Sequence, residues 1–205
     1  MTSDDSEKPN GKSHDDARNH GPPNPAGWVR RFIGGIKAGG DILDVACGAG
    51  RHLRLALEQG YRVTGIDIDV SKLDDLAERR DVSLIEADLE AGHPFPLRDL
   101  RYDGVIVTNY LWRPILPEIV GCVADDGLLI YETFSDGHER KGKPSNPDFL
   151  LKRNELLGAV MDKLVVVAFE YGLRPDKQPK IVQRVAACGP DHDWADRKHF
   201  PLNGH

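Results

Sequence analysis

The sequence predicts an α/β fold built on one sheet of seven strands, mostly parallel, with an antiparallel hairpin at its C-terminal end. Two observations predict it. Apolar runs typical of strands buried on both faces alternate with stretches of helical spacing, as in a parallel sheet with crossover helices. The last two apolar runs are separated only by residues 174–179, which are too few for a crossover helix. These two strands must therefore be antiparallel.

The predicted elements follow one another in a regular order. Strands are predicted at about residues 41–47, 62–68, 82–88, 103–109, 127–134, 164–173 and 180–188. Helices are predicted at about residues 28–36, 50–59, 71–80, 113–124 and 152–163. We expect Gly60 to end the second of these helices and Ser71 to cap the third.

Both ends of the chain are polar. Residues 1–25 contain only Met1 and Ala17 as apolar side chains, so this segment cannot bury enough surface to offset its ordering entropy. We therefore expect a disordered tail over residues 1–25, one domain over residues 26–188 and a loose tail over residues 189–205.

The composition limits the classes of function. A net charge of −6 argues against a dedicated nucleic-acid binder, and no apolar run is long enough to span a membrane. The N-terminus has no signal-peptide pattern, and the three cysteines are widely spaced in apolar surroundings, which indicates reduced, buried thiols. We expect a cytoplasmic protein. The histidines show no metal-ligand spacing, so no metal site is predicted.

Two segments carry the chemistry of the first half. Residues 42–50 read Ile-Leu-Asp-Val-Ala-Cys-Gly-Ala-Gly, and residues 63–69 read Val-Thr-Gly-Ile-Asp-Ile-Asp. A nucleoside-binding sheet needs a glycine turn that lets the backbone approach the ligand and an acid that accepts hydrogen bonds from the ribose hydroxyls. A dinucleotide fingerprint needs a third glycine, but Leu53 occupies that position. Together with the terminal hairpin, this argues against a nicotinamide oxidoreductase.

The turn from Asp44 to Gly50 resembles motif I of the class I S-adenosylmethionine (SAM) methyltransferases, with Ala46 where many members carry glycine. Later segments resemble small bacterial methyltransferases similar to the tellurite-resistance group. These segments are Tyr131-Glu-Thr-Phe134, Gly142-Lys-Pro144, Asn146-Pro147, Phe149-Leu-Leu151 and Glu155-Leu-Leu157. The resemblance covers about residues 40–188 and implies a Rossmann-like methyltransferase sheet with SAM as its cofactor.

The resemblance also implies a cofactor site at the carboxyl ends of the strands. Its residues are Asp44, Ala46, Gly48, Gly50, Asp67, Ile68, Asp88, Leu89 and Asn109. Asp44 is expected to orient the turn, and the N–H groups of Gly48 and Gly50 to reach the carboxylate and ribose of the ligand. Asp67 is expected to accept hydrogen bonds from the ribose hydroxyls, and Asp88 is expected to accept one from the adenine amino group. Helix-capping or loop roles for Asp67 and Asp69 are the alternative.

The acceptor side is less defined. Asn109 is expected near the sulfonium, and the segment after it lacks the prolines of methyltransferases that act on planar amino groups. Asn109, Glu132 and His138 are the candidate catalytic residues, and a base is needed only if the acceptor must lose a proton. Residues 135–149 form either a lid over the acceptor or a solvated loop. Tyr110, Trp112, Arg113 and Tyr131 are further candidates for the acceptor pocket, while Arg51 and His52 either touch the ligand carboxylate or form a solvated pair.

The sequence therefore predicts a SAM-dependent methyltransferase whose partner is an unidentified small polar or anionic acceptor. An RNA or protein methyltransferase and a catalytically inactive SAM-binding module remain alternatives. Nucleic acid is not expected as a partner, and the oligomeric state is left open.

Overall fold

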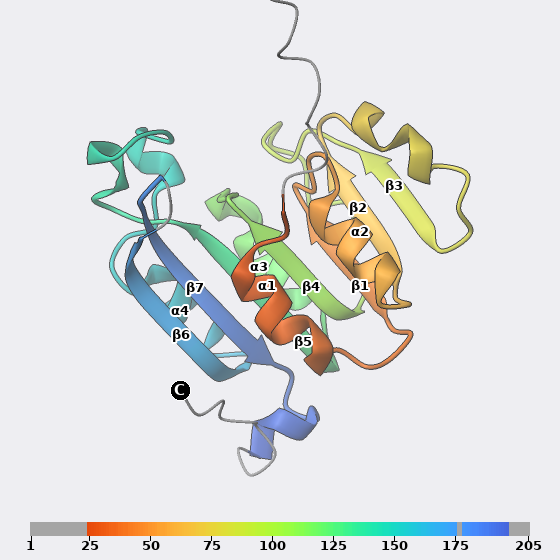
Figure 1. Cartoon of the computed structure of the whole chain (residues 1–205). Helices are drawn as coiled ribbons and strands as arrows, with labels where there is room; N and C mark the ends of the chain where they lie inside the picture. Colours follow the sequence, from red (N-terminus) through yellow and green to blue (C-terminus); the bar gives the residue numbers. More distant parts are fainter. Residues whose placement is uncertain (1–23, 176–177, 197–205) are drawn as a thin grey trace, which may run out of the picture.

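A single seven-stranded sheet organises the chain (Figure 1), whose computed structural model describes residues 24–175 and 178–196. Most of the predicted N-terminal tail, residues 1–23, lies outside the described residues, as do residues 197–205. The strands are β1 (Asp41–Val45), β2 (Arg62–Asp67), β3 (Val82–Glu86), β4 (Tyr102–Thr108), β5 (Val123–Phe134), β6 (Val165–Arg174) and β7 (Lys180–Cys188). Their order across the sheet is β3-β2-β1-β4-β5-β7-β6.

The direction of each strand confirms the predicted topology. β3, β2, β1, β4 and β5 pair in parallel, whereas β7 pairs antiparallel with both β5 and β6. The short link that follows β6 therefore makes the predicted hairpin. Because the first five strands run in one direction, their carboxyl ends meet along one edge of the sheet, where a ligand binds in open α/β sheets.

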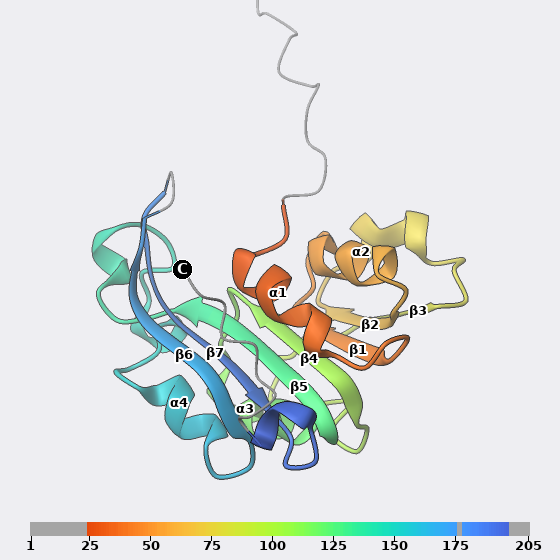
Figure 2. The same cartoon turned by 60° about the horizontal axis from the view of Figure 1, so that its bottom comes forward.

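Helices cover both faces of the sheet. The helical segments are α1 (Gly27–Phe32), η1 (Ile33–Gly35), α2 (Arg51–Glu58), η2 (Ser71–Leu76), η3 (Arg113–Ile115), α3 (Leu116–Gly121), η4 (His138–Arg140), η5 (Pro147–Phe149), α4 (Glu155–Val160) and η6 (Asp193–Asp196), where η marks 3-10 turns. Figure 2 shows α1 and α2 on one side of the sheet and α3 and α4 on the other. Two apolar clusters fill the two interfaces, one on each face.

Two helical predictions need correction. The segment predicted as a helix over residues 71–80 is only the short 3-10 turn η2, and Ser71 is not its cap. Val70 is the N-cap residue, and Asp69 before it accepts hydrogen bonds from the Ser71 backbone N–H at 3.0 Å and from the Ser71 hydroxyl at 2.6 Å. Such a local side-chain bond competes with regular helix formation. The helix predicted at 152–163 is also shorter, because Asn154 adopts a left-handed φ of 59° just before α4.

Two other predictions agree better with the structure. Gly60 follows α2 with a φ of +83°, the conformation that ends a helix and that glycine adopts without steric cost. The three cysteines are buried and none forms a disulfide. Among the described residues, no helix has the length and apolar character needed to cross a membrane.

The beginning of the predicted C-terminal tail packs against the body. His192 is buried, and its Nε2 lies 3.0 Å from the Gly35 carbonyl oxygen. Trp194 makes an edge contact with Phe32 of α1, with 6.4 Å between the ring centroids. The packed part of the chain therefore extends past the predicted boundary at residue 188.

Leu53 gives a direct test of the packing between α2 and the sheet. Its side chain is fully buried beside Gly65 of β2 and occupies the position of the absent third glycine. Leu53→Ala should lower the free energy of unfolding by about 2–5 kcal/mol, because it removes buried methyl groups and leaves a cavity. Urea denaturation followed by circular dichroism measures this change. Leu100→Ala, at a half-exposed leucine, is the matched control and should change stability by less than about 0.5 kcal/mol; equal losses in the two variants would contradict the packing argument.

Candidate active site

The turn after β1 has a backbone conformation that suits small residues. Ala46, Gly48 and Gly50 have φ values of +53°, +55° and +72°. Glycine adopts this left-handed region without strain, whereas a residue with a Cβ is strained there. At Gly50 a Cβ would also lie 2.4 Å from Cδ2 of the buried Leu73. The spacing of small residues in this segment therefore has a steric cause.

The N–H groups of the turn bond within the protein. The Gly48 N–H donates to Oδ2 of Asp67 at 2.7 Å, and the Gly50 N–H donates to the Cys47 carbonyl at 3.0 Å. The structure therefore differs from the prediction that these two N–H groups reach the ligand. Asp67 links the end of β2 to the turn after β1, so the carboxylate predicted to contact ribose also fixes the turn.

A cavity of about 420 Å³ opens beside this link at the carboxyl ends of the strands. Its lining residues are Ala46, Asp67, Ile68, Ala87, Asp88, Leu89, Glu90 and Tyr110. Five of the predicted cofactor residues thus lie around one space, although they come from three separate loops. The carboxylate of Asp88, in the loop after β3, accepts a hydrogen bond from the Glu90 N–H at 2.9 Å.

Sequence reasoning placed Tyr110 on the acceptor side, but the side chain lines this cavity. Its hydroxyl is buried and has no hydrogen-bond partner among the described residues, and burial together with nearby carboxylates raises the pKa of this hydroxyl. A buried polar group without a partner is costly in a folded protein. The cavity therefore combines carboxylates, apolar walls and an unpartnered hydroxyl, a set that fits a nucleoside with polar substituents.

Asp44 lies beneath the turn and is almost fully buried. Its Oδ2 has no hydrogen-bond partner in the described part of the chain, and His52 Nδ1 is 3.8 Å away. Burial raises the pKa of Asp44 to about 8, an effect that Arg51 opposes and Asp67 reinforces. Burial likewise lowers the pKa of His52 to about 3, so this ring is neutral. His52 is thus a buried residue, which rules out the solvated-pair interpretation for it.

A second cavity of about 210 Å³ lies next to the first. Its lining residues are Asn24, Pro25, Ala26, Gly27, Arg51, Asn109, Glu132, Arg174, Lys180 and Arg184. Asn109 lines this cavity and the next residue, Tyr110, lines the first, so the two spaces are neighbours at the end of β4. Four cationic side chains and one carboxylate face this second space, which gives it a positive balance.

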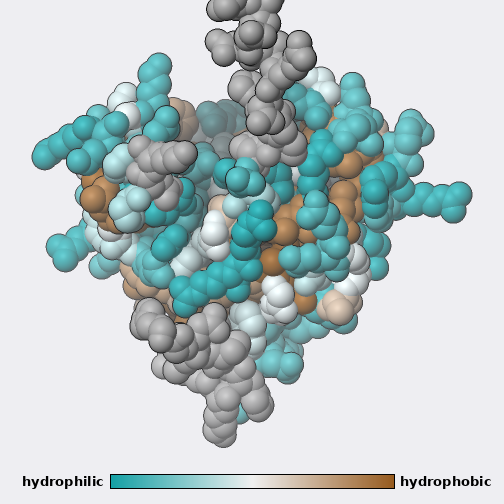
Figure 3. All heavy atoms as spheres, viewed as in Figure 1, coloured by the Kyte–Doolittle hydropathy of each residue, from teal (hydrophilic) through white to brown (hydrophobic). Residues whose placement is uncertain are grey.

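The charges of the second cavity belong to one network of ion pairs. Glu132 is buried and pairs with Arg174 and with Arg184, the latter at 3.3 Å. Arg184 also pairs with Glu170 of β6, and Arg31 of α1 pairs with the same carboxylate at 3.2 Å. In Figure 3 hydrophilic side chains gather over β6, β7 and α1, the elements that carry this network. The network holds both oxygens of Glu132, so its carboxylate is not free to act as the predicted base.

His138 is also held by the backbone. Its Nε2 lies 3.1 Å from the Lys143 carbonyl, its Nδ1 accepts the Ile181 N–H at 3.4 Å, and its ring stacks on Phe134. His138 lines neither cavity. The ring therefore anchors the loop over residues 135–149 to the end of β7, which does not suit the base predicted at this position.

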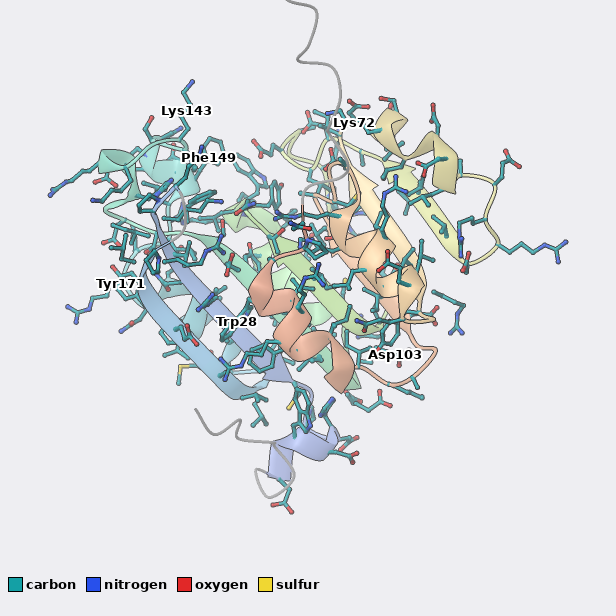
Figure 4. All side chains as sticks on the ribbon, viewed as in Figure 1. Trp28, Lys72, Asp103, Lys143, Phe149 and Tyr171 are labelled. Carbon is teal, nitrogen blue, oxygen red and sulfur yellow. The ribbon has the colours of Figure 1, made fainter. Side chains whose placement is uncertain are left out.

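Arg113 fastens the other end of this loop. Its guanidinium pairs with Glu155 at 2.6 Å and donates to the carbonyl oxygens of Asp148 and Leu150. Figure 4 places Lys143 and Phe149 of this loop near the end of the β6–β7 hairpin.

Tyr131 is fully buried, and its hydroxyl donates to the Tyr110 carbonyl at 2.9 Å. Trp112 lines a separate cavity with Pro114 and Glu118. Arg113, Tyr131 and Trp112 therefore lie outside the two cavities of the site.

The cations of the hairpin had no role predicted from the sequence. Lys180, Val182 and Arg184 recur every second residue along β7, and this spacing places their side chains on one face of the strand. Arg184 is the register partner of both Glu132 on β5 and Glu170 on β6. The alternation was visible in the sequence, but the pairing of β7 between β5 and β6 was needed to bring these charges together.

The burial of Asp44 generates a prediction about pH. The carboxyl binds its proton more tightly in the folded chain (pKa about 8) than in the unfolded chain (pKa near 3.8). Its contribution to stability is therefore complete below pH 3.8 and is lost as the pH rises toward 8. Asn cannot ionise, so Asp44→Asn should gain stability relative to the wild type across this range, by an amount on the order of a few kcal/mol.

Urea denaturation of the wild type and Asp44→Asn at several pH values measures the difference. Asp99→Asn, whose side chain is 90% exposed, is the control and should follow the wild type. Parallel stability curves for the wild type and Asp44→Asn would contradict the assigned burial effect.

Comparison with known proteins agrees with this geometry. Residues 42–127, which include the turn, Asp67 and Asp88, match the family described as "Methyltransferase domain". No curated protein sequence matches the chain.

Three solved structures have a similar fold. TehB from Haemophilus influenzae is 20% identical, with a TM-score of 0.58 over 79% of this chain and 61% of that protein. A SAM-dependent methyltransferase from Mesorhizobium loti is 15% identical, with a TM-score of 0.61 over 79% and 97%. The Burkholderia thailandensis 1,6-didemethyltoxoflavin-N1-methyltransferase, solved with 1,6-didemethyltoxoflavin and S-adenosylhomocysteine, is 18% identical, with a TM-score of 0.58 over 78% and 75%.

The chain thus spans less than two thirds of the Haemophilus influenzae protein. At these identities the similarity to the three solved structures concerns the fold alone. Residues 42–127 thus match a methyltransferase-domain family, and the sheet as a whole has the fold of these three proteins.

Proposed function

We propose that this protein transfers a methyl group from SAM to a small anionic acceptor that binds in the second cavity. The observation that carries the proposal is the lining of that cavity, where Arg51, Arg174, Lys180 and Arg184 face one carboxylate, Glu132. Cationic side chains donate charge-assisted hydrogen bonds to carboxylates and oxyanions. A volume of about 210 Å³ suits a small molecule better than a nucleotide chain or a folded protein.

The first cavity takes the cofactor in this proposal. Asp67 accepts the ribose hydroxyls, because an ionised carboxylate offers two acceptor oxygens and no donors. Asp88 accepts the adenine amino group, and Ile68 and Leu89 form apolar walls against the ring. The Tyr110 hydroxyl, which has no hydrogen-bond partner among the described residues, gains one in the bound nucleoside.

The chain contributes positioning and electrostatics to the reaction. When bound, SAM would supply a methyl group on a positively charged sulfur, and an acceptor lone pair would attack the methyl carbon in line with the C–S bond, with the sulfur as the leaving group. The C–S bond breaks as the bond to the acceptor forms, which leaves S-adenosylhomocysteine. An acceptor that enters as an anion already carries its lone pair, so no protein base is required. This agrees with the backbone and ion-pair contacts that hold His138 and Glu132.

Asn109 has a positioning role at the boundary of the two cavities. Its φ is +56°, and its N–H donates to the Glu132 carbonyl at 2.9 Å, so the ends of β4 and β5 fix its backbone. The exposed side chain can then orient an acceptor toward the methyl group. Holding reactants in line is the main source of rate in such a displacement.

Calorimetric titration with SAM, S-adenosylhomocysteine and NAD tests the cofactor part. We expect binding of the first two ligands and none of NAD.

The acceptor part is tested by transfer of a radiolabelled methyl group to a panel of small carboxylates and oxyanions. Bulk RNA and a protein extract are tested as acceptors in parallel. Transfer only to RNA or protein would contradict the small acceptor, and cofactor binding without any transfer would support an inactive SAM-binding module.

Asp67→Asn tests the ribose contact without removing the brace on the turn. The amide oxygen can still accept the Gly48 N–H, but the charge and one acceptor oxygen are lost. One charge-assisted hydrogen bond contributes about 1.5–3 kcal/mol, so the affinity for S-adenosylhomocysteine should fall roughly 10- to 100-fold. Calorimetry measures the affinity, and urea denaturation confirms folding. Asp69→Asn changes an exposed acid that accepts a hydrogen bond from Ser71 and should leave the affinity unchanged; a loss as large as that of Asp67→Asn would refute the ribose role.

Lys180→Gln tests the cationic lining. Lys180 begins β7 at the rim of the second cavity, and its ammonium lies 5.5 Å from the centre of the Phe134 ring. Loss of one cation should raise the KM for the anionic acceptor roughly 10-fold. The affinity for S-adenosylhomocysteine should stay at the wild-type value. Lys141→Gln removes an exposed lysine outside both cavities and is the matched control. An unchanged KM in Lys180→Gln would exclude this lysine from acceptor binding.

A further inference from the structure

His52 lies between Ala26, which lines the second cavity, and Asp44, beneath the turn whose Ala46 lines the first. The ring is 2% exposed and lies in the first turn of α2, directly after Arg51. Its Nε2 accepts the Ala26 N–H at 3.2 Å. A neutral imidazole that accepts at Nε2 carries its proton on Nδ1, and Nδ1 faces Asp44 Oδ2 at 3.8 Å. The donor and the unpartnered acceptor are therefore less than about 1 Å beyond hydrogen-bonding distance.

Ala26 belongs to a wall of the second cavity. Residues 24–27 lie at the start of α1 and line this space opposite the hairpin cations. Trp28 provides the next anchor, because its Nε1 donates to the Val185 carbonyl of β7 at 3.1 Å and its ring lies under the Arg184 guanidinium. Figure 4 shows Trp28 on the face of the sheet beside β7. The wall is thus anchored to β7 through Trp28 and to α2 through His52.

We propose that His52 is a positioning residue that couples occupancy of the cofactor cavity to the rigidity of the wall at residues 24–27. The inference rests on the proposed function, because it needs a cofactor above the turn that Asp44 supports. A ligand there orders the turn and the carboxyl beneath it, and a shift of less than about 1 Å closes the bond from His52 Nδ1 to Asp44. When both ring nitrogens are hydrogen-bonded, His52 holds the Ala26 N–H more firmly. The wall at residues 24–27, and with it the acceptor cavity, is then fixed only when the methyl donor is bound.

The rate of hydrogen exchange at the Ala26 amide measures this coupling and does not depend on enzymatic activity. S-adenosylhomocysteine, whose binding calorimetry measures on the same sample, should slow exchange of this amide in the wild type. Couplings between sites usually change an equilibrium about 5- to 150-fold, so we expect at least about fivefold slower exchange. The amide of Ala195, which donates to the His192 carbonyl far from the cofactor turn, should not change.

Two substitutions separate the contacts of His52. In His52→Gln the side-chain oxygen can accept the Ala26 N–H, but no group remains to face Asp44. The Ala26 amide should stay protected in the free protein and no longer respond to S-adenosylhomocysteine. His52→Ala should lose the protection in both states. His192→Gln is the matched control, since His192 is another buried histidine with backbone contacts at both ring nitrogens; it should keep the wild-type response.

The outcomes distinguish the two proposals. If the wild type binds S-adenosylhomocysteine but exchange at Ala26 is unchanged, the coupling is wrong and the cofactor site stands. A full response in His52→Gln would equally overturn the role of the Asp44 contact. If the wild type does not bind S-adenosylhomocysteine, the proposed function fails and the coupling fails with it.

Discussion

The hydrogen bond from the Gly48 N–H to the Asp67 carboxylate, at 2.7 Å, is the contact on which the site depends. It joins the carboxyl ends of two neighbouring parallel strands and fixes the turn that carries three left-handed residues. With the turn in place, Asp44 is enclosed beneath it and the first cavity opens beside it. One oxygen of Asp67 is engaged by Gly48 and the other accepts the Asp69 N–H at 3.2 Å. The same carboxylate thus fixes the turn and lines the first cavity.

The charges of the two cavities complement the reaction proposed for them. Asp67, Asp88 and Glu90 line the first cavity, whereas arginines and a lysine line the second. A cofactor with a sulfonium charge is favoured on the acidic side, and an anion is favoured on the basic side. The two reactants are then drawn toward the boundary at Asn109 from opposite directions. This local separation exists although the whole chain has a net charge of −6, because most charged side chains lie elsewhere on the surface.

The fold was predictable because it depends on local patterns. Apolar runs, the turn at Gly60 and the short link after β6 gave the strand directions without tertiary information. Five of the residues predicted for the cofactor lie around one cavity for a similar reason, since they stand at or just after the carboxyl ends of parallel strands. The contacts of Ser71, Glu132 and His138 could not be derived from the sequence, because they depend on the partners that the fold brings to each residue. Asp69 accepts a hydrogen bond from Ser71, two arginines of the hairpin pair with Glu132, and two backbone groups contact His138.

The start of α1 shows why a site of this kind extends beyond its motifs. Residues 24–27 precede the first strand and carry none of the family's motifs, yet they face hairpin residues more than a hundred positions later. Two buried contacts determine their place, from Ala26 to His52 and from Trp28 to Val185. Ala26 lines the second cavity, and its partner His52 lies beside Asp44 beneath the turn after β1, so this segment is tied to the surroundings of both cavities. Among the described residues, Asn24 and Pro25 also line the second cavity, so a boundary drawn at residue 26 from composition alone separates residues of one cavity.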